Sequence, residues 1–287
     1  MEVNWSDIDV KERKKVFRRL AAEKNMSRED KTKLLKNMYE GLECVCLTTG
    51  GSLSEFTKEK IEKMYGEIPV FSVKMAAIKY AKITDICVTN FYNTFDFEGV
   101  LPFLFLARNE APIGYANQVN LNLINPKTHI TKFKGKVDIL WGCDNRCLHS
   151  NSVCNANRWE ENTLDKQPTD RILGPGILND MAIPVMMHTG VSKIKIIGWD
   201  GSVLDEKGSV EHFYDIEEQF RPVANCMRRN LDLSTIKADL KEDEQQVVRR
   251  AELDIKNFLN NNGIEIEILT KLSHVDKAIK RNFELYE

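Results

Sequence analysis

The chain has 287 residues, 42% of them hydrophobic, and a formal net charge of −2. This length suits one large α/β domain or two modest ones, and the apolar content is sufficient for a core. The charge balance gives no sign of a general nucleic-acid binder, and no run reaches the ~18 apolar residues of a membrane span. No secretory signal begins the chain, so we predict a cytoplasmic protein whose seven cysteines are reduced thiols.

Residues 1–42 are predicted to form a helical extension of two helices ahead of the main domain, which we expect to span residues 43–287. The run from Lys11 to Arg19 is basic and carries an apolar stripe that includes Val16 and Phe17. Such a helix either packs on the main domain or makes a peripheral contact with an anionic membrane surface. We favour packing as the simpler interpretation.

A glycine-bearing turn, Thr48-Thr-Gly-Gly-Ser-Leu53, follows the first predicted strand. Gly50 and Gly51 allow the backbone to approach a ligand closely, and Ser52 is suited to capping the helix that follows. A turn of this kind after the first strand of an α/β sheet is the usual position of a nucleotide phosphate. An ordinary tight turn has the same composition, so both interpretations stay open.

Further strands are expected at residues 68–73, 85–89, 101–107 and 137–141, with a helix at 74–81. Asn90 and Asn93 follow the strand at 85–89, and ligands of open sheets bind at the carboxyl ends of strands. These two asparagines are therefore candidates for the site.

A group of cysteines and a histidine falls in the long irregular segment 143–170: Cys143, Cys147, His149 and Cys154. Thiolates and imidazole are zinc ligands, but this spacing matches no standard zinc module. Buried or incidental cysteines are the preferred interpretation.

The stretch from Arg171 to Ser202 contains a turn, a helix and a buried strand in succession. Gly174 and Gly176 flank a proline in the turn, and the strand ends at Asp200. A glycine-rich turn before a helix, leading to a strand with an acid at its end, is how α/β enzymes build phosphate and nucleotide sites.

The end of the chain continues the alternation, with a helix expected at 243–259, a strand at 264–269 and a helix at 274–283. Strands that alternate with helices throughout predict an α/β fold with a Rossmann-like, doubly wound, mostly parallel sheet. A mobile lid is expected at about 201–240, and it carries the motif His212-Phe-Tyr214.

Three stretches together resemble the bacterial lipooligosaccharide sialyltransferases and the related 6-hydroxymethylpterin pyrophosphokinase-like family of glycan biosynthesis. They are Thr48–Leu53, Phe71–Lys74, and Ile172–Gly176 continued through Gly198–Asp200. The HFY-like motif of the family's glycan members is similar to residues 212–214. The resemblance implies transfer of an acidic sugar from a CMP-activated donor to a glycan acceptor.

Site residues follow from the residue types together with this resemblance. His212 is expected to act as general base, because imidazole titrates near neutral pH. Tyr214 is expected to donate to the leaving phosphate, and Asp200 to hold a ribose, an acceptor hydroxyl or a metal. Donor binding is assigned to Thr49, Gly50, Gly51, Ser52, Lys74, Asn90, Gly174 and Gly176. No cofactor is required, and a homo-oligomer is left open.

The chain departs from the family pattern, and two alternatives follow. Thr49 replaces the asparagine that contacts the donor, Gly51 replaces a proline, and Gly201 replaces an aromatic residue. A diphosphokinase of the pterin type would need Mg²⁺ held by carboxylates such as Asp200. A non-catalytic glycan- or partner-binding module on the same fold is favoured by the loss of the asparagine. In structural terms, residues 212–215 could be a turn with Phe213 in the core, and Asp200 could cap a turn.

Overall fold

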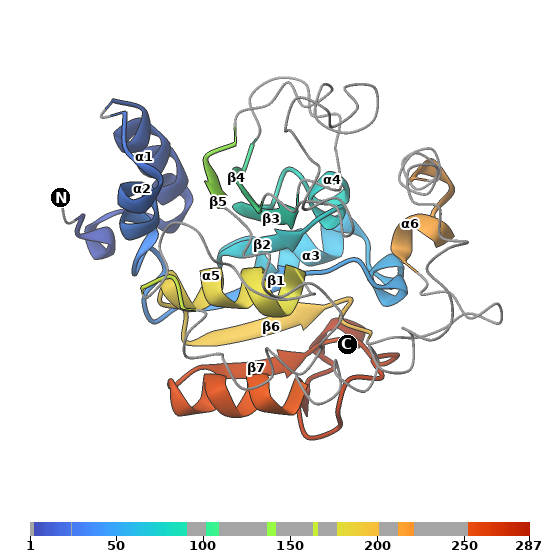
Figure 1. The fold of residues 1–287 in the computed structure, drawn as a ribbon. Helices are drawn as coiled ribbons and strands as arrows, with labels where there is room; N and C mark the ends of the chain where they lie inside the picture. Colours follow the sequence, from blue (N-terminus) through green and yellow to red (C-terminus); the bar gives the residue numbers. More distant parts are fainter. Residues whose placement is uncertain are drawn as a thin grey trace, which may run out of the picture.

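One parallel β-sheet organises the chain, in the strand order β5-β4-β3-β2-β1-β6-β7-β8 (Figure 1). The computed structural model describes residues 3–23, 25–90, 102–108, 137–141, 163–165, 177–200, 212–220 and 252–287. Every pair of neighbouring strands in the sheet is parallel. The predicted doubly wound, Rossmann-like α/β fold is therefore confirmed.

The strands are β1 (Glu43–Leu47), β2 (Val70–Val73), β3 (Ile86–Asn90), β4 (Leu104–Arg108), β5 (Ile139–Trp141), β6 (Lys193–Ile197), β7 (Glu265–Ile268) and β8 (Lys280–Arg281). From β1 the chain builds β2 to β5 outward on one side and then returns to place β6 on the other side of β1. The order of the strands thus reverses between β1 and β6. In open sheets this switch point, at the carboxyl ends of the strands, is where ligands bind.

The helices are α1 (Val10–Glu23), α2 (Arg28–Leu35), α3 (Lys58–Tyr65), α4 (Ala76–Lys79), α5 (Ile183–His188), α6 (Phe213–Ile216) and a helix at 252–261. Short 3₁₀ segments are η1 (Trp5–Asp7), η2 (Gly51–Glu55), η5 (Glu218–Phe220) and η6 (Glu284–Tyr286). A wider, π-helical turn, η4 (Leu178–Ala182), leads into α5, whose Pro184 lies in the first turn, where proline is tolerated.

Two cores form because side chains alternate between the faces of each strand. In β1, Cys44 and Cys46 join α1, α2, α5 and the helix at 252–261 on one face. Val45 and Leu47 join α3, α4 and α6 on the other. All four side chains are fully buried, which accounts for the unbroken apolar character of β1.

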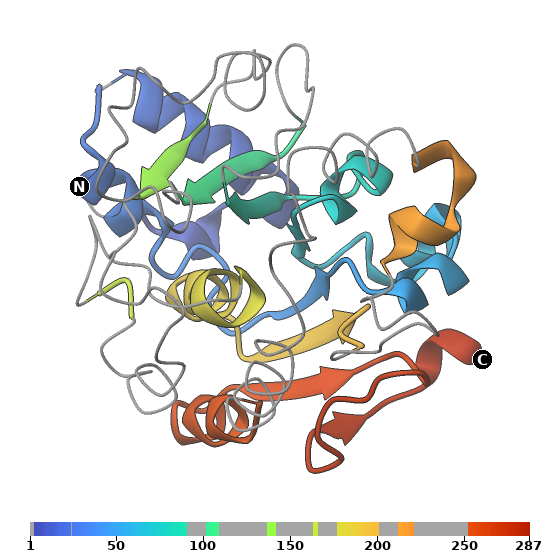
Figure 2. The same cartoon turned by 45° about the vertical axis from the view of Figure 1, so that its right-hand side comes forward.

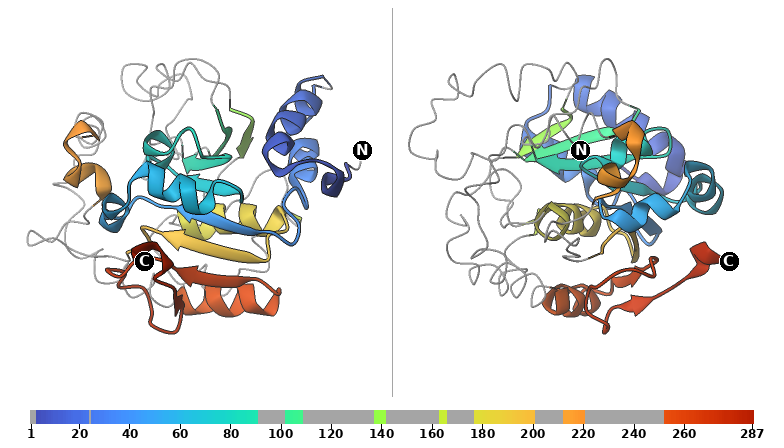
Figure 3. Two further views of the ribbon diagram at one scale, coloured as in Figure 1. Left: turned by 180° about the vertical axis from the view of Figure 1, so that it is seen from behind. Right: turned by 90° about the vertical axis from the view of Figure 1, so that its right-hand side faces the viewer.

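The helical extension predicted for residues 1–42 is present, and α1 packs on the sheet. Phe17 is fully buried, Lys14 pairs with Asp85 at 3.4 Å, and Arg18 lies 3.4 Å from Asp138. Two of its basic residues are thus engaged within the protein, as the packing interpretation expects. The extension lies near β5, at one end of the strand order, and the C-terminal segment contains β8, at the other end (Figure 3). None of the described helices is long and apolar enough to cross a membrane.

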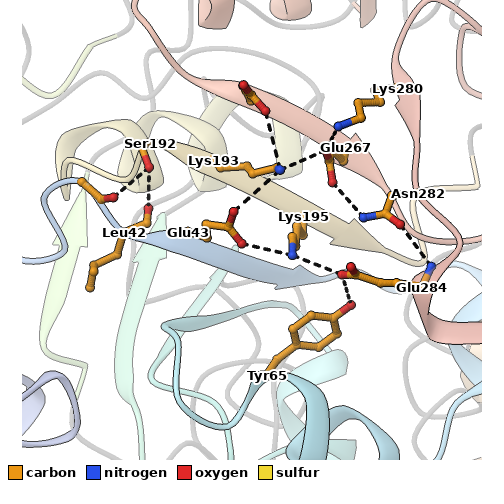
Figure 4. A network of polar contacts seen from close by, with 12 residues as sticks. Leu42, Glu43, Tyr65, Ser192, Lys193, Lys195, Glu267, Lys280, Asn282 and Glu284 are labelled. Carbon is orange, nitrogen blue, oxygen red and sulfur yellow. Dashed lines mark hydrogen bonds and ion pairs between the residues drawn. The ribbon is translucent and has the colours of Figure 1, made fainter.

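Charged side chains form a network of ion pairs on one face of β6 and β7 (Figure 4). Lys195 pairs with Glu43 on β1 at 3.0 Å and with Glu284 at 3.1 Å, and Lys193 pairs with Glu267 at 3.0 Å. Glu284 also accepts a hydrogen bond from the Tyr65 hydroxyl at 2.7 Å. These contacts attach the C-terminal segment across the sheet face.

The helix predicted at 274–283 is wrong: these residues form turns and the short edge strand β8. Side chains bond the local backbone here, since Asp276 accepts from the Ala278 N–H at 2.7 Å and Ser273 from the Val275 N–H at 3.4 Å. Such bonds compete with helix formation.

The charge of Glu267 should make stability depend on pH. Burial alone would raise the pKa of Glu267, but hydrogen bonds from Lys280, Lys193 and Asn282 outweigh it and lower the pKa to about 2. The stabilisation is therefore present above the usual glutamate pKa of ~4.3 and is lost as the pH falls toward 2. We expect Glu267→Gln to lower the free energy of unfolding by about 1–3 kcal/mol at pH 7 and by less at pH 3.

Urea unfolding at the two pH values measures this effect. Glu265→Gln is the matched control, because its carboxylate is mostly exposed and 3.6 Å from Lys193. A loss of stability that is the same at pH 7 and pH 3 would contradict the role given to the charge of Glu267.

Candidate functional site

At the switch point, the turn after β1 is bonded to the end of β6. The Thr48 N–H donates to the Ile197 carbonyl at 2.9 Å, and the Gly50 N–H to the Gly198 carbonyl at 3.0 Å. Gly198 has a φ of +84°, which a side chain would disfavour. The two strand ends therefore stay paired beyond the regular sheet and bring Asp200 over η2.

The carboxylate of Asp200 is buried and caps η2. One of its oxygens accepts from the Ser52 N–H at 2.8 Å, and the other accepts from the Ser52 hydroxyl. Burial raises the pKa of Asp200 above its ordinary value, and the hydrogen bonds from Ser52 oppose this rise. Asp200 thus caps a turn, although this turn follows β1 and not β6.

The donors expected to cradle a phosphate are in part already used. The Gly50 N–H is bonded to Gly198, and both donors of Ser52 are bonded to Asp200. Ser52 also does not cap the next helix: Thr57 does, accepting from the Lys60 N–H at 3.3 Å. The hydrogen-bonding groups of Gly50 and Ser52 therefore hold the turn in place.

A glycine is required at position 50 by packing. A Cβ atom there would lie 2.2 Å from the Gly198 carbonyl oxygen and 2.5 Å from the Asp200 carboxylate. The space that we expected a ligand to use beside Gly50 is occupied by the end of β6.

The structure brings His212 and Tyr214 to this turn. Figure 2 shows the orange segment that contains α6 beside the blue segment that follows β1. His212 forms an antiparallel bridge with Gly50, and the Phe213 N–H donates to the Thr49 carbonyl at 3.1 Å. Nδ1 of His212 lies 3.2 Å from the same carbonyl, and the Tyr214 ring stacks on the imidazole at 4.8 Å. Phe213 is fully buried, as the structural interpretation of this motif expected.

The carbonyl of Thr49 fixes the tautomer of His212. A carbonyl oxygen can only accept, so Nδ1 must carry the hydrogen, and the neutral ring has its lone pair on Nε2. This is the arrangement by which histidine bases are oriented in enzymes.

Two further predicted residues lie at the same edge of the sheet. Lys74 directly follows β2 and has a φ of +51°, and its N–H donates to the Val88 carbonyl at 3.0 Å. Asn90 is the last residue of β3, where the structure describes its backbone. Because β1, β2 and β3 are adjacent and parallel, Lys74 and Asn90 lie with Gly50 at the carboxyl ends of these strands.

His274 and Tyr286 join this edge from the C-terminal segment. The His274 N–H donates to the Asp200 carbonyl at 2.7 Å, and the Tyr286 hydroxyl donates to Glu55 of η2 at 2.7 Å. Neither contact was predicted: His274 was expected to begin a helix, and Tyr286 lies beyond that predicted helix. A cavity of ≈ 970 Å³ lies elsewhere, lined by residues that include Trp5 and Asn37, and contains none of the predicted site residues.

Other predictions lie outside the described residues: Asn93, Gly174, Gly176, the group Cys143, Cys147, His149 and Cys154, and residues 201–211 and 221–240 of the expected lid. Among the residues that are described, no three His, Cys, Asp or Glu side chains are grouped so that they could hold a metal ion.

Topology therefore defines the class of this protein as α/β with a Rossmann-like parallel sheet. The chain matches no protein-family model and no curated protein.

Replacing Gly50 with alanine should destabilise the protein strongly, because the new Cβ meets backbone at 2.2 Å. Gly263→Ala is the matched control: Gly263 has a φ of +73° but open space around it. We expect the control to cost about 1 kcal/mol and Gly50→Ala at least ~2 kcal/mol more, as measured by chemical denaturation. Equal losses in the two variants would show that the β1 and β6 ends are not packed as described.

Proposed function

We propose that this chain is a glycosyltransferase that moves a sugar from a nucleotide-activated donor to a glycan acceptor. The resemblance in its motifs favours a CMP-activated acidic sugar as the donor. One observation carries the proposal: His212 and Tyr214 lie against the turn after β1, at the switch point of a parallel sheet. Open sheets bind nucleotides at this position.

His212 is the proposed general base. Its Nδ1–H is held by the Thr49 carbonyl, so Nε2 accepts the proton of the acceptor hydroxyl. The acceptor oxygen then forms a bond to the anomeric carbon of the sugar while the bond from that carbon to the donor phosphate breaks. Tyr214, stacked on the imidazole, is the proposed hydrogen-bond donor to the departing phosphate.

Donor binding is proposed to involve Lys74 and Asn90, at the ends of β2 and β3. The ammonium group of Lys74 supplies the positive charge that a phosphate requires. Asp200, whose two oxygens both accept from Ser52, is proposed to shape the turn and not to bind the ribose. This use of the carboxylate also disfavours the Mg²⁺-dependent diphosphokinase, for which Asp200 was one of the expected carboxylate ligands.

A panel of nucleotides tests the class of donor. Thermal unfolding would be followed with CMP, CDP, UDP and GDP, and with ATP plus Mg²⁺. A ligand at 100 times its dissociation constant stabilises the folded state by ~2.7 kcal/mol. We expect the largest rise in melting temperature with CMP. The largest rise with ATP and Mg²⁺ would favour the diphosphokinase, and no rise with any nucleotide would favour the non-catalytic module.

Replacing His212 with alanine should lower kcat by ~10²-fold or more, with donor affinity little changed, because the base acts on the acceptor hydroxyl. Tyr214→Phe should cost less, about the ~1.5–3 kcal/mol of a hydrogen bond to a charged group. Steady-state kinetics with donor and acceptor varied separately measure both effects. His274→Ala, at the same edge, is the control, and a wild-type rate for His212→Ala would refute the assignment.

A further inference from the structure

The segment that carries His212 is attached to the rest of the protein by an ion pair. Lys79, the last residue of α4, contacts the carboxylate of Glu217, which directly follows α6. Their side chains are only 11% and 16% exposed. A pair this well shielded is screened by salt much less than a surface pair.

The ammonium group of Lys79 contacts η2 as well as α6. It donates to the Leu53 carbonyl at 3.2 Å and lies 5.6 Å from the centre of the Phe213 ring. It also lies 5.2 Å from the centre of the Tyr80 ring. One positive charge therefore links three elements that are far apart in the sequence: α4, η2 and α6.

These links complete a ring of contacts around the switch point. Asp200 attaches η2 to the end of β6, and Lys79 attaches η2 to α6. The bond from the Phe213 N–H to Thr49 then returns from α6 to the turn after β1. His212 immediately precedes Phe213, so its ring can face Thr49 only while α6 is in place.

We infer that Lys79 and Glu217 are positioning residues that hold His212 in its orientation against Thr49. The catalytic part of this inference rests on the proposed function, whereas the holding of α6 rests on the contacts alone. Removing the charge of Glu217 leaves a shielded ammonium group without its carboxylate, and this disfavours the docked arrangement.

Hydrogen exchange of the Phe213 amide tests the holding of α6, because this N–H is bonded to Thr49. We expect Glu217→Gln to speed its exchange about tenfold, with no comparable change in the matched neighbour Glu218→Gln, whose side chain is exposed. The double variant Lys79→Glu with Glu217→Lys restores opposite charges and should bring the exchange back toward the wild-type rate.

Kinetics test the catalytic consequence. Glu217→Gln should lower kcat about tenfold with the KM for the donor nearly unchanged, and the double variant should recover part of the loss. Equal exchange and equal kcat in Glu217→Gln and Glu218→Gln would overturn the inference, even where His212→Ala abolishes activity. An inactive wild type with faster exchange in Glu217→Gln would instead overturn the proposed function and leave α6 held by the pair.

Discussion

The carboxylate of Asp200 joins the two halves of the sheet, because it lies at the end of β6 and accepts two hydrogen bonds from Ser52 after β1. A buried carboxylate is costly unless its oxygens are bonded, and here both are. The contact needs glycine at position 50, since the Gly198 carbonyl occupies the space of a side chain. The space beside Gly50 at the switch point is thus filled by the Gly198 carbonyl and the Asp200 carboxylate.

The candidate site is built on this closed turn. The Thr49 carbonyl accepts from both Phe213 and His212, so the motif at 212–214 docks on a turn that Asp200 already holds in place. Phe213 supplies the buried anchor, and Lys79 supplies the charge that holds α6. A side chain placed this way keeps its direction, which a catalytic base needs.

Ion pairs hold the C-terminal segment on the part of the sheet formed by β6 and β7. One face of β6 and β7 is covered by the C-terminal segment through Lys195, Glu267 and Glu284 (Figure 4). The strand within residues 171–202 is predicted to be buried, although it contains Lys193 and Lys195. In the structure both lysines are partly buried and form ion pairs with carboxylates of neighbouring strands. This face of the sheet is therefore held by ion pairs, and the apolar core ends beside it.

Local patterns were sufficient for the parallel sheet. The strands at 43–47 and 193–197 and the helices between strands follow from the spacing of their apolar residues, which depends on near neighbours alone. The same holds for the glycine turn and for the two N-terminal helices. Only tertiary structure decided that Asp200 reaches Ser52, that His212 lies on Thr49, and that residues 274–283 form turns and a strand. These contacts join residues up to 163 positions apart, and a hydrogen bond between such residues depends on how the strands are ordered, which periodicity does not encode.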